Sequence, residues 1–153
     1  MYAPHGCCDC DVLLACFDPA HRIALIRPEA TGDGRPPALP AVRRRTGEPY
    51  RQAAGRLARA MAPAGGLRFG HVTGRNPAAG RGSAAQQRVE RRLFTAHVPA
   101  SGDLHPPQED THLVWSPYGE AAAQLAHLAI ADLDAFLQGY VEGWIPNGWI
   151  TLG

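Results

Sequence analysis

The sequence predicts an α+β fold in which a single domain contains a mixed β-sheet. Three observations lead to this prediction. The 153 residues can build one substantial hydrophobic core, whereas two cores would be crowded. Periodicity gives strands before and after a first helix, then two helical segments at the end. Strands that outnumber helices early in the chain argue against a doubly wound parallel sheet, and no stretch repeats another.

A predicted β-hairpin opens the domain. Residues 12–17 (VLLACF) form an apolar run typical of a buried strand, and the DPAHR segment at 18–22 is typical of a turn. Residues 23–27 then supply the partner strand. Regular structure ends in the segment 28–37, because it holds three Pro and two Gly within ten residues.

The first helix is expected after a short extended piece at 39–44. Helical periodicity runs from Pro49 to about Met61, and proline is favoured in the first turn of a helix. Pro63 and the glycine pair at 65–66 then stop the helix.

Three further strands are expected at 67–73, 88–98 and 111–116. The segment 74–87 between the first two has the composition of a linker but is too short to divide two domains. We therefore expect a mobile loop there. The loop PASGDLHPPQED separates the last two strands.

Two helical segments, at about 120–127 and 131–141, close the domain. The remaining residues are rich in tryptophan and carry a turn signal at Asn147-Gly148. We expect this tail to pack on the domain or on a second subunit, which would make the protein a homodimer. The predicted division is a cysteine-rich lead-in at 1–10, a domain at 11–142 and a tail at 143–153.

Composition and charge bear on the partners. A net charge of +1 gives no overall attraction to nucleic acid or to an anionic membrane, so we expect neither partner. Apolar runs stay well below the ~18–20 residues of a membrane span. The N-terminal residues lack the features of a secretory signal, and we expect a cytoplasmic location. All fifteen basic residues are arginine, whose guanidinium suits bidentate contacts with phosphate.

Four cysteines, Cys7, Cys8, Cys10 and Cys16, lie near the N-terminus. A closed zinc site usually draws on two separated pairs of ligands, and no second cysteine pair follows. A regulatory thiol is an alternative. Reduced cysteines beside the first strand are the favoured interpretation.

The residues around the first helix resemble a Nudix box. Leu39-Pro40 matches the usual lead-in of that family, Gly47-Glu48 aligns with its first glutamate, and Arg56 falls on its arginine after seven intervening residues. The order of hairpin, box and later strands is also similar, so the resemblance covers roughly residues 10–140. It implies a Nudix-like α/β/α sandwich with a mixed sheet.

The box departs from the family pattern where the family binds metal. The three helix carboxylates of the family fall on Leu57, Ala60 and Met61, which are three and four residues apart and therefore share one helix face. Mg²⁺ requires oxygen ligands at about 2.0–2.1 Å, and such a metal also lowers the pKa of the attacking water. We therefore expect no metal site, no cofactor and no ordinary Mg²⁺-dependent pyrophosphohydrolysis.

Glu48 and Arg56 keep the family pattern. The resemblance implies that this pair braces the loop of the box against the helix. The alternative is that both are exposed charges on an arginine-rich helix.

The VRRRTG segment at 42–47 offers a candidate anion site beside the helix N-terminus. Successive residues of an extended chain point to alternate faces, so at most two of its three arginines converge. A solvated face is the alternative. The candidate ligand-binding residues are Arg43, Arg45 and Arg56. Aromatic candidates for stacking on a nucleobase are Tyr118, Tyr140, Trp144 and Trp149.

Candidate catalytic residues come from the acids that remain. Glu48, Glu109 and Asp110 could form a rebuilt site that uses Mg²⁺ or Mn²⁺, and the resemblance places the latter two in a loop that sometimes supplements the metal site. The alternative is that Glu109 and Asp110 are ordinary surface acids, because most exposed acids do no chemistry.

Taken together, the residues predict a Nudix-like pseudoenzyme, an inactive or atypical member of the hydrolase family. We expect it to bind a nucleotide, another phosphorylated small molecule or a protein partner. The alternative is an active Nudix hydrolase of a nucleoside diphosphate derivative that uses the non-standard acids. A third possibility is an unrelated α+β domain in which the box is a coincidence.

Overall fold

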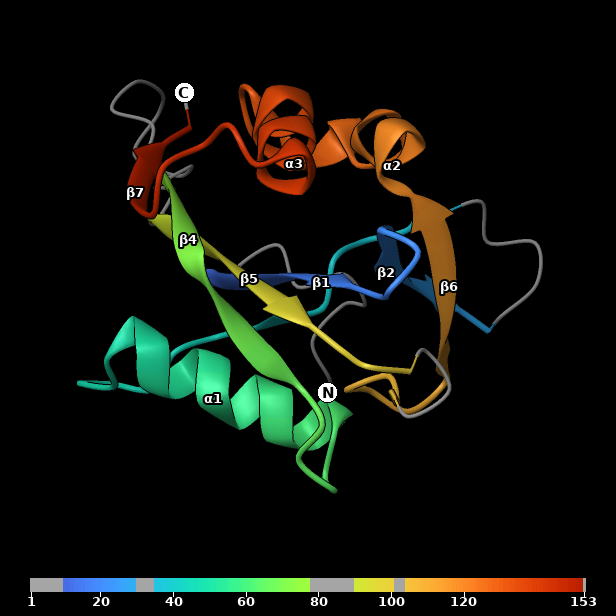
Figure 1. The fold of residues 1–153 in the computed structure, drawn as a ribbon. Helices are drawn as coiled ribbons and strands as arrows, with labels where there is room; N and C mark the ends of the chain where they lie inside the picture. Colours follow the sequence, from blue (N-terminus) through green and yellow to red (C-terminus); the bar gives the residue numbers. More distant parts are fainter. Residues whose placement is uncertain (1–9, 30–34, 78–89, 101–103, 153) are drawn as a thin grey trace.

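A computed structural model describes residues 10–29, 35–77, 90–100 and 104–152. In these ranges a seven-stranded mixed sheet lies between two helical layers (Figure 1). Helix α1 (Tyr50–Met61) covers one face. Helices α2 (Tyr118–Gln124) and α3 (Leu133–Glu142), joined by the 3₁₀ helix η3 (Ala126–Leu128), cover the other face. The predicted α/β/α sandwich with a mixed sheet in a single domain is confirmed.

The order of strands across the sheet is β6-β2-β1-β5-β4-β7, and β3 pairs with β1. Two pairs are parallel, β1 with β5 and β4 with β7, and the other pairs are antiparallel. The strands are β1 (Val12–Phe17), β2 (Arg22–Pro28), β3 (Ala41–Val42), β4 (Arg68–Asn76), β5 (Arg91–His97), β6 (Thr111–Pro117) and β7 (Gly148–Thr151).

Strand β1 is buried on both faces and separates two hydrophobic cores. Val12, Leu14 and Cys16 belong to the core under α1. Their neighbours Leu13, Ala15 and Phe17 belong to the core under α2 and α3. Because successive side chains of a strand point to opposite faces, a strand covered on both sides must be apolar throughout. This is why VLLACF is a continuous apolar run.

Helix α1 begins within one residue of the prediction, with Pro49 as its N-cap. Its buried residues recur three and four positions apart, which places them on the face toward the sheet. They are Ala53, Ala54, Leu57, Ala58 and Met61. The extended piece predicted at 39–44 contains the two-residue strand β3, and the helix predicted at 120–127 breaks after Gln124, before η3.

The tail contains a strand that the sequence analysis missed. β7 pairs in parallel with residues Val72–Arg75 of β4. Beyond it, the Leu152 amide donates to the Arg75 carbonyl at 2.7 Å, and the Leu152 side chain is fully buried. Ile150 and Leu152 therefore enter the α2/α3-side core, and this alternation was the available signal.

Two predictions concern residues that the structure describes only in part, the loop at 74–87 and the N-terminal cysteines. The loop expected at 74–87 begins with the last residues of β4, and its residues 78–87 lie outside the described ranges, as do residues 1–9 with Cys7 and Cys8.

Cys10 is buried and takes part in a disulfide bond, so the prediction of a reduced cysteine is wrong for this residue. Cys16 is a free thiol, and burial raises its pKa to about 12. Among the described helices, none has the length and apolarity that a membrane crossing needs.

Two glycine-to-alanine variants, one in α1 and one in β4, test how closely the surrounding side chains pack at each position. At Gly55, in the interior of α1, a Cβ would lie 3.5 Å from Arg59 Nη1, an ordinary contact. We expect Gly55→Ala to raise the free energy of unfolding by about 0.5–1 kcal/mol, because glycine loses more backbone entropy in a helix. At Gly74 a Cβ would lie 2.7 Å from the buried Leu152 Cδ1. Gly74→Ala should lower the same free energy, by about 1–3 kcal/mol. Urea denaturation measures both, and equal effects would contradict this packing.

Candidate functional site

A bidentate ion pair holds the loop before α1 against the helix. Arg56 donates from Nη2 to Glu48 Oε1 at 2.8 Å and from Nε to Oε2 at 3.3 Å. The Arg45 amide donates to Oε1 at 3.0 Å, and Arg56 Nη2 also reaches the Arg43 carbonyl at 3.0 Å. Glu48 is only 8% exposed. The structure therefore brings Glu48 and Arg56 together as a brace between loop and helix.

The same contacts set the charge of this pair. The hydrogen bonds from Arg56 and then from the Arg45 amide lower the pKa of Glu48 to about 2, against burial, which acts in the opposite direction. The hydrogen bond to Glu48 raises the pKa of Arg56. Both groups are charged at neutral pH. A carboxylate with so low a pKa is a poor general base near pH 7, so Glu48 is suited to holding the loop.

The three consecutive arginines point in different directions. Arg44 is anchored, since its Nε donates to Asp11 Oδ2 and its amide to Oδ1, both at 2.8 Å. Arg43 and Arg45 are exposed on either side of it. Within the described residues, neither of their side chains makes an ion pair or a hydrogen bond. This is the alternation that the sequence predicted, and it leaves two guanidinium groups near the start of α1.

The helix start is itself favourable to an anion. The N-cap Pro49 makes no side-chain hydrogen bond to the helix, and the first turn contains no acidic residue. The first N–H groups of a helix have no partner within the helix and carry the positive end of its dipole. Arg43, Arg45 and these N–H groups form what we call the box-loop site.

The sequence analysis aligned three positions of α1 with the metal ligands of the Nudix family, and two of them are buried. Leu57 is 2% exposed and Met61 is fully buried, both in the core under α1, whereas Ala60 is exposed. The shared face that the sequence predicted therefore holds for Leu57 and Met61 and not for Ala60. The loop after β5 closes over this end of the helix, because the His105 amide donates to the Met61 carbonyl at 2.8 Å and Leu104 is buried in the same core.

These side chains do not fit a magnesium or manganese ion. A hard dication requires oxygen ligands, and leucine, alanine and methionine side chains offer none. Elsewhere in the described ranges, no group of three or more His, Cys, Asp or Glu residues is placed to hold a metal.

Glu109 and Asp110 are exposed in the loop before β6, where the Asp110 carbonyl accepts the Glu29 amide at 2.9 Å. Glu48 lies at the N-terminal end of α1. Figure 1 shows that end of α1 and the start of β6 on opposite sides of the molecule. The structure thus does not gather the three acids into one site, and a catalytic role for any of them stays a prediction.

An alternating stack of arginine and aromatic side chains was missed by the sequence analysis. The Arg44 guanidinium lies 3.8 Å from the Tyr50 ring centre, and Arg92 lies 4.2 Å from that ring and 4.5 Å from the ring of Trp149. We call these four residues the arginine–aromatic stack. Its members come from the box loop, α1, β5 and β7. No pattern in the sequence indicates this stack, because Trp149 joins it only through the pairing of β7 with β4.

Glu90 anchors the sheet side of this stack. Its carboxylate forms ion pairs with Arg92 and with Arg75, the latter at 2.9 Å, and the Tyr50 hydroxyl donates to its carbonyl at 3.2 Å. Burial raises the pKa of Glu90, but hydrogen bonds from Arg92 and Arg75 outweigh it, so the pKa is lowered overall. The stack is therefore held by charge as well as by ring contacts.

Comparison with known proteins gives matches by structure and none by sequence. No family model matches this sequence, and no curated protein matches it. The fold is similar to that of the Nudix hydrolase RenU from M. smegmatis, with a TM-score of 0.58 and 20% identity over 90% of this chain and 88% of that one.

Two further solved structures are similar in the same way. A binary complex of the C. elegans Ap4A hydrolase gives a TM-score of 0.60 at 15% identity, over 86% of this chain and 94% of that one. The MutT protein from Bacillus halodurans gives 0.53 at 11% identity, over 92% and 84%. At these sequence identities the comparison shows similarity of fold alone.

The Glu48–Arg56 brace predicts a pH dependence of stability. The folded-state pKa of Glu48 is about 2 and its ordinary value is 4.5, so its ionised form stabilises the fold above about pH 5. As pH falls from 4.5 toward 2, the unfolded chain takes up the proton first and this contribution is lost. We expect the Tm difference between the wild type and Glu48→Gln to be constant from about pH 5 to 7 and to shrink toward pH 2.

The matched control is Glu120→Gln, at an exposed position on α2. Its Tm difference from the wild type should change much less over the same range. A Glu48→Gln difference that persists unchanged to about pH 2.5 would contradict the brace.

Proposed function

We propose, starting from the Nudix hydrolase fold that this chain adopts, that the protein binds a nucleotide or another phosphorylated small molecule at the box-loop site. In this proposal the box has lost the metal ligands of the helix. The protein is then a binding member of the fold that does not perform ordinary Mg²⁺-dependent pyrophosphohydrolysis.

One observation carries the proposal: Leu57 and Met61 are packed into the core under α1. Hydrolysis of the family's kind depends on a metal that neutralises phosphate charge and activates water. Apolar side chains that are buried at these positions supply neither function. They instead secure α1 to the sheet, since burying a side chain of this size stabilises a fold by about 1.5–3 kcal/mol.

The box-loop site supports binding without a metal. Arg43 and Arg45 can form charge-assisted hydrogen bonds to phosphate oxygens, and the start of α1 adds backbone N–H groups. Arg56, the third predicted ligand residue, is engaged with Glu48 and with the Arg43 carbonyl. Its part in the proposal is to hold the loop that presents the other two arginines.

The fold neighbours suggest which molecules to try first. One of them is described as an Ap4A hydrolase. A panel of Ap4A, ADP, GDP and ADP-ribose covers a dinucleoside polyphosphate, two nucleoside diphosphates and a diphosphate-linked sugar.

Thermal stabilisation in the presence of chelator tests metal-free binding. We expect at least one member of the panel to raise the Tm in EDTA, because a ligand that binds only the folded state stabilises it, by about 2.7 kcal/mol at one hundred times its Kd. The double variant Arg43→Gln/Arg45→Gln should abolish the shift. Arg59→Gln, at the far end of α1, should keep it. No shift at millimolar ligand, or a shift that survives the double variant, would refute binding at this site.

A turnover assay with Mn²⁺ and the same panel tests the loss of hydrolysis. We expect phosphate release no higher than in the blank, with phosphatase added to reveal phosphomonoester products. Turnover that disappears in Glu109→Ala would establish the alternative, an active hydrolase with non-standard acids. Turnover that persists in that variant would equally overturn the non-hydrolytic proposal.

A further inference from the structure

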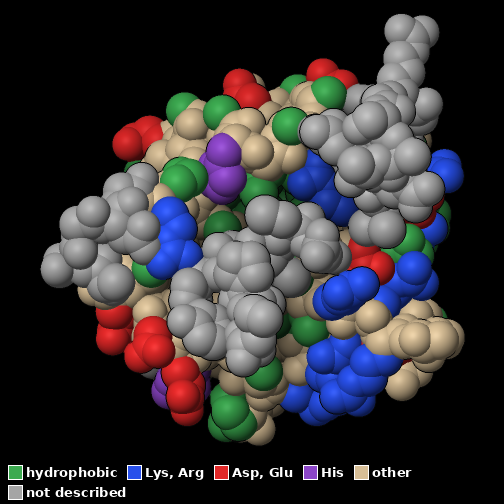
Figure 2. All heavy atoms as spheres, turned by 180° about the vertical axis from the view of Figure 1, so that it is seen from behind, with side chains coloured by type: hydrophobic (Ala, Val, Ile, Leu, Met, Phe, Trp, Pro, Cys, Tyr) green, Lys and Arg blue, Asp and Glu red, His purple; other side chains and the backbone are tan. Residues whose placement is uncertain are grey.

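The charges of this protein are separated between its two helical layers. Residues 35–77, which include α1, contain nine arginines and one acidic residue, the buried Glu48. Residues 104–152, which include α2 and α3, contain six acidic residues and no arginine or lysine. The net charge of +1 is therefore a balance between a basic pole and an acidic pole. Figure 2 shows arginine side chains gathered in the corner of the molecule that α1 occupies.

Exposed arginines follow α1 along its outer side. Arg51 and Arg59 lie two turns apart, about 12 Å at 1.5 Å per residue, and both are exposed. Gly55 lies between them, and Arg59 Nη1 would be 3.5 Å from a Cβ at that position. The Arg59 guanidinium thus extends along the helix toward Arg51. Among the described residues, neither arginine has an ion-pair partner, and Arg43 and Arg45 continue the row beyond the start of the helix.

The exposed indole of Trp149 stands at the same end. Trp149 pairs with Thr73 of β4, which in turn pairs with Phe94 of β5, and Phe94 belongs to the core under α1. Residues paired in this way share a face of the sheet, so Trp149 lies on the α1 side. Arg92 covers part of its ring, yet 59% of the residue remains exposed. The arginine–aromatic stack therefore presents an accessible ring beside the arginine row.

We propose that this basic face binds single-stranded nucleic acid, with the backbone along the arginine row and a base stacked on Trp149. A row of unpaired guanidinium groups this long matches a chain of phosphates better than a single phosphate group. Stacking on an aromatic ring needs a base that is not already stacked in a duplex, and the two features together are typical of single-strand binding. The low net charge does not oppose this, because screening limits surface charges to an effective reach of about 8 Å.

This inference goes beyond the proposed function, although one end of the arginine row coincides with the box-loop site. Its test rests on Arg51, Arg59 and Trp149, which the box-loop site does not require. Loss of oligonucleotide binding in the former variants with retained nucleotide stabilisation would separate the two sites.

Fluorescence anisotropy with labelled twelve-residue oligo-dT and oligo-U in 50 mM salt tests the proposal. We expect binding of at least one of them, with affinity falling as salt rises. Arg51→Gln/Arg59→Gln should reduce the slope of log K against log salt by about 1.4, because each phosphate contact on a single strand contributes ~0.7. Arg27→Gln, in β2 toward the other edge of the sheet, is the arginine control and should leave the slope unchanged.

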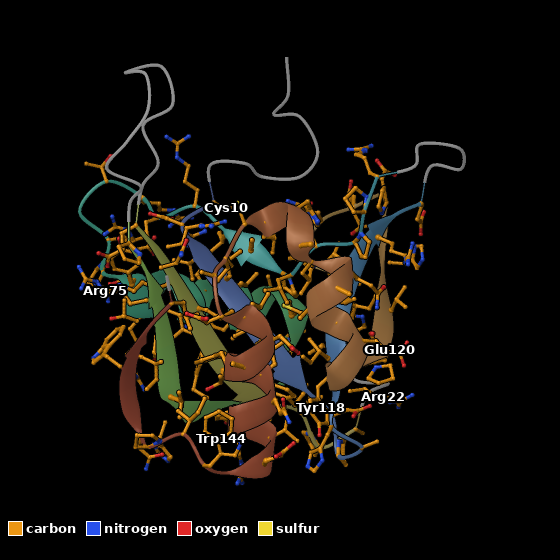
Figure 3. The ribbon with its side chains drawn as sticks, turned by 90° about the horizontal axis from the view of Figure 1, so that it is seen from above. Cys10, Arg22, Arg75, Tyr118, Glu120 and Trp144 are labelled. Atoms are coloured by element: carbon orange, nitrogen blue, oxygen red, sulfur yellow. The ribbon has the colours of Figure 1, made fainter. Side chains whose placement is uncertain are left out.

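Trp149→Ala should weaken binding about 5- to 150-fold, as expected for the loss of one base–aromatic stack, and Trp149→Phe should retain most of it. The matched control is Trp144→Ala. Trp144 is also 59% exposed, but it follows α3, and Figure 3 places it well away from Arg75, which is paired with Thr151 near Trp149. Circular dichroism confirms that each variant is folded.

Three results would overturn the proposal. The first is no binding of either oligonucleotide at 50 µM protein. The second is equal affinity for a duplex of the same length, or equally strong competition by inorganic polyphosphate, since either would mean that no base is recognised. The third is a Trp149→Ala variant that binds as well as the wild type and the Trp144→Ala control.

Discussion

The burial of β1 on both faces is the constraint on which the rest of the structure depends. A central strand with apolar side chains on both sides requires a helical layer on each face of the sheet, and α1 provides one of them. The position of α1 in turn determines where the box loop ends and where its arginines stand. A change in the packing of α1 would therefore move the arginines of the candidate site even if none of those arginines were substituted.

The two halves of α1 make different contributions. At its start, the Glu48–Arg56 brace ties the box loop to the helix through charged hydrogen bonds. At its end, Leu57 and Met61 tie the helix to the sheet through burial. In a Nudix hydrolase with carboxylates at these positions, the end of the helix would have to present charge to solvent or metal. In this chain Leu57 and Met61 are buried in the core under α1, where they contribute to packing.

The distribution of charge on the surface follows the two helical layers. Because the segment 35–77, which includes α1, holds nine arginines and one acidic residue, whereas α2 and α3 hold only acidic charges, the two helical layers differ in the sign of their charge. The electrostatic field of such a charged surface acts over a short distance, and the net charge of the whole chain does not reveal it. The arginine–aromatic stack connects the box loop and α1 to β5 and β7, since Arg44, Tyr50, Arg92 and Trp149 lie against one another in turn.

The sequence by itself determined the local elements, because they depend on short-range periodicity: the apolar run of β1 and the helix from Tyr50 to Met61 were predicted to within a residue. It also determined the spacing of Glu48 and Arg56, through a motif contained in one loop and one helix. Only the tertiary structure decided that β7 joins β4, that the start of β6 lies on the opposite side of the molecule from the start of α1, and that Trp149 stacks on Arg92. These facts depend on contacts between segments distant along the chain, which no local pattern encodes.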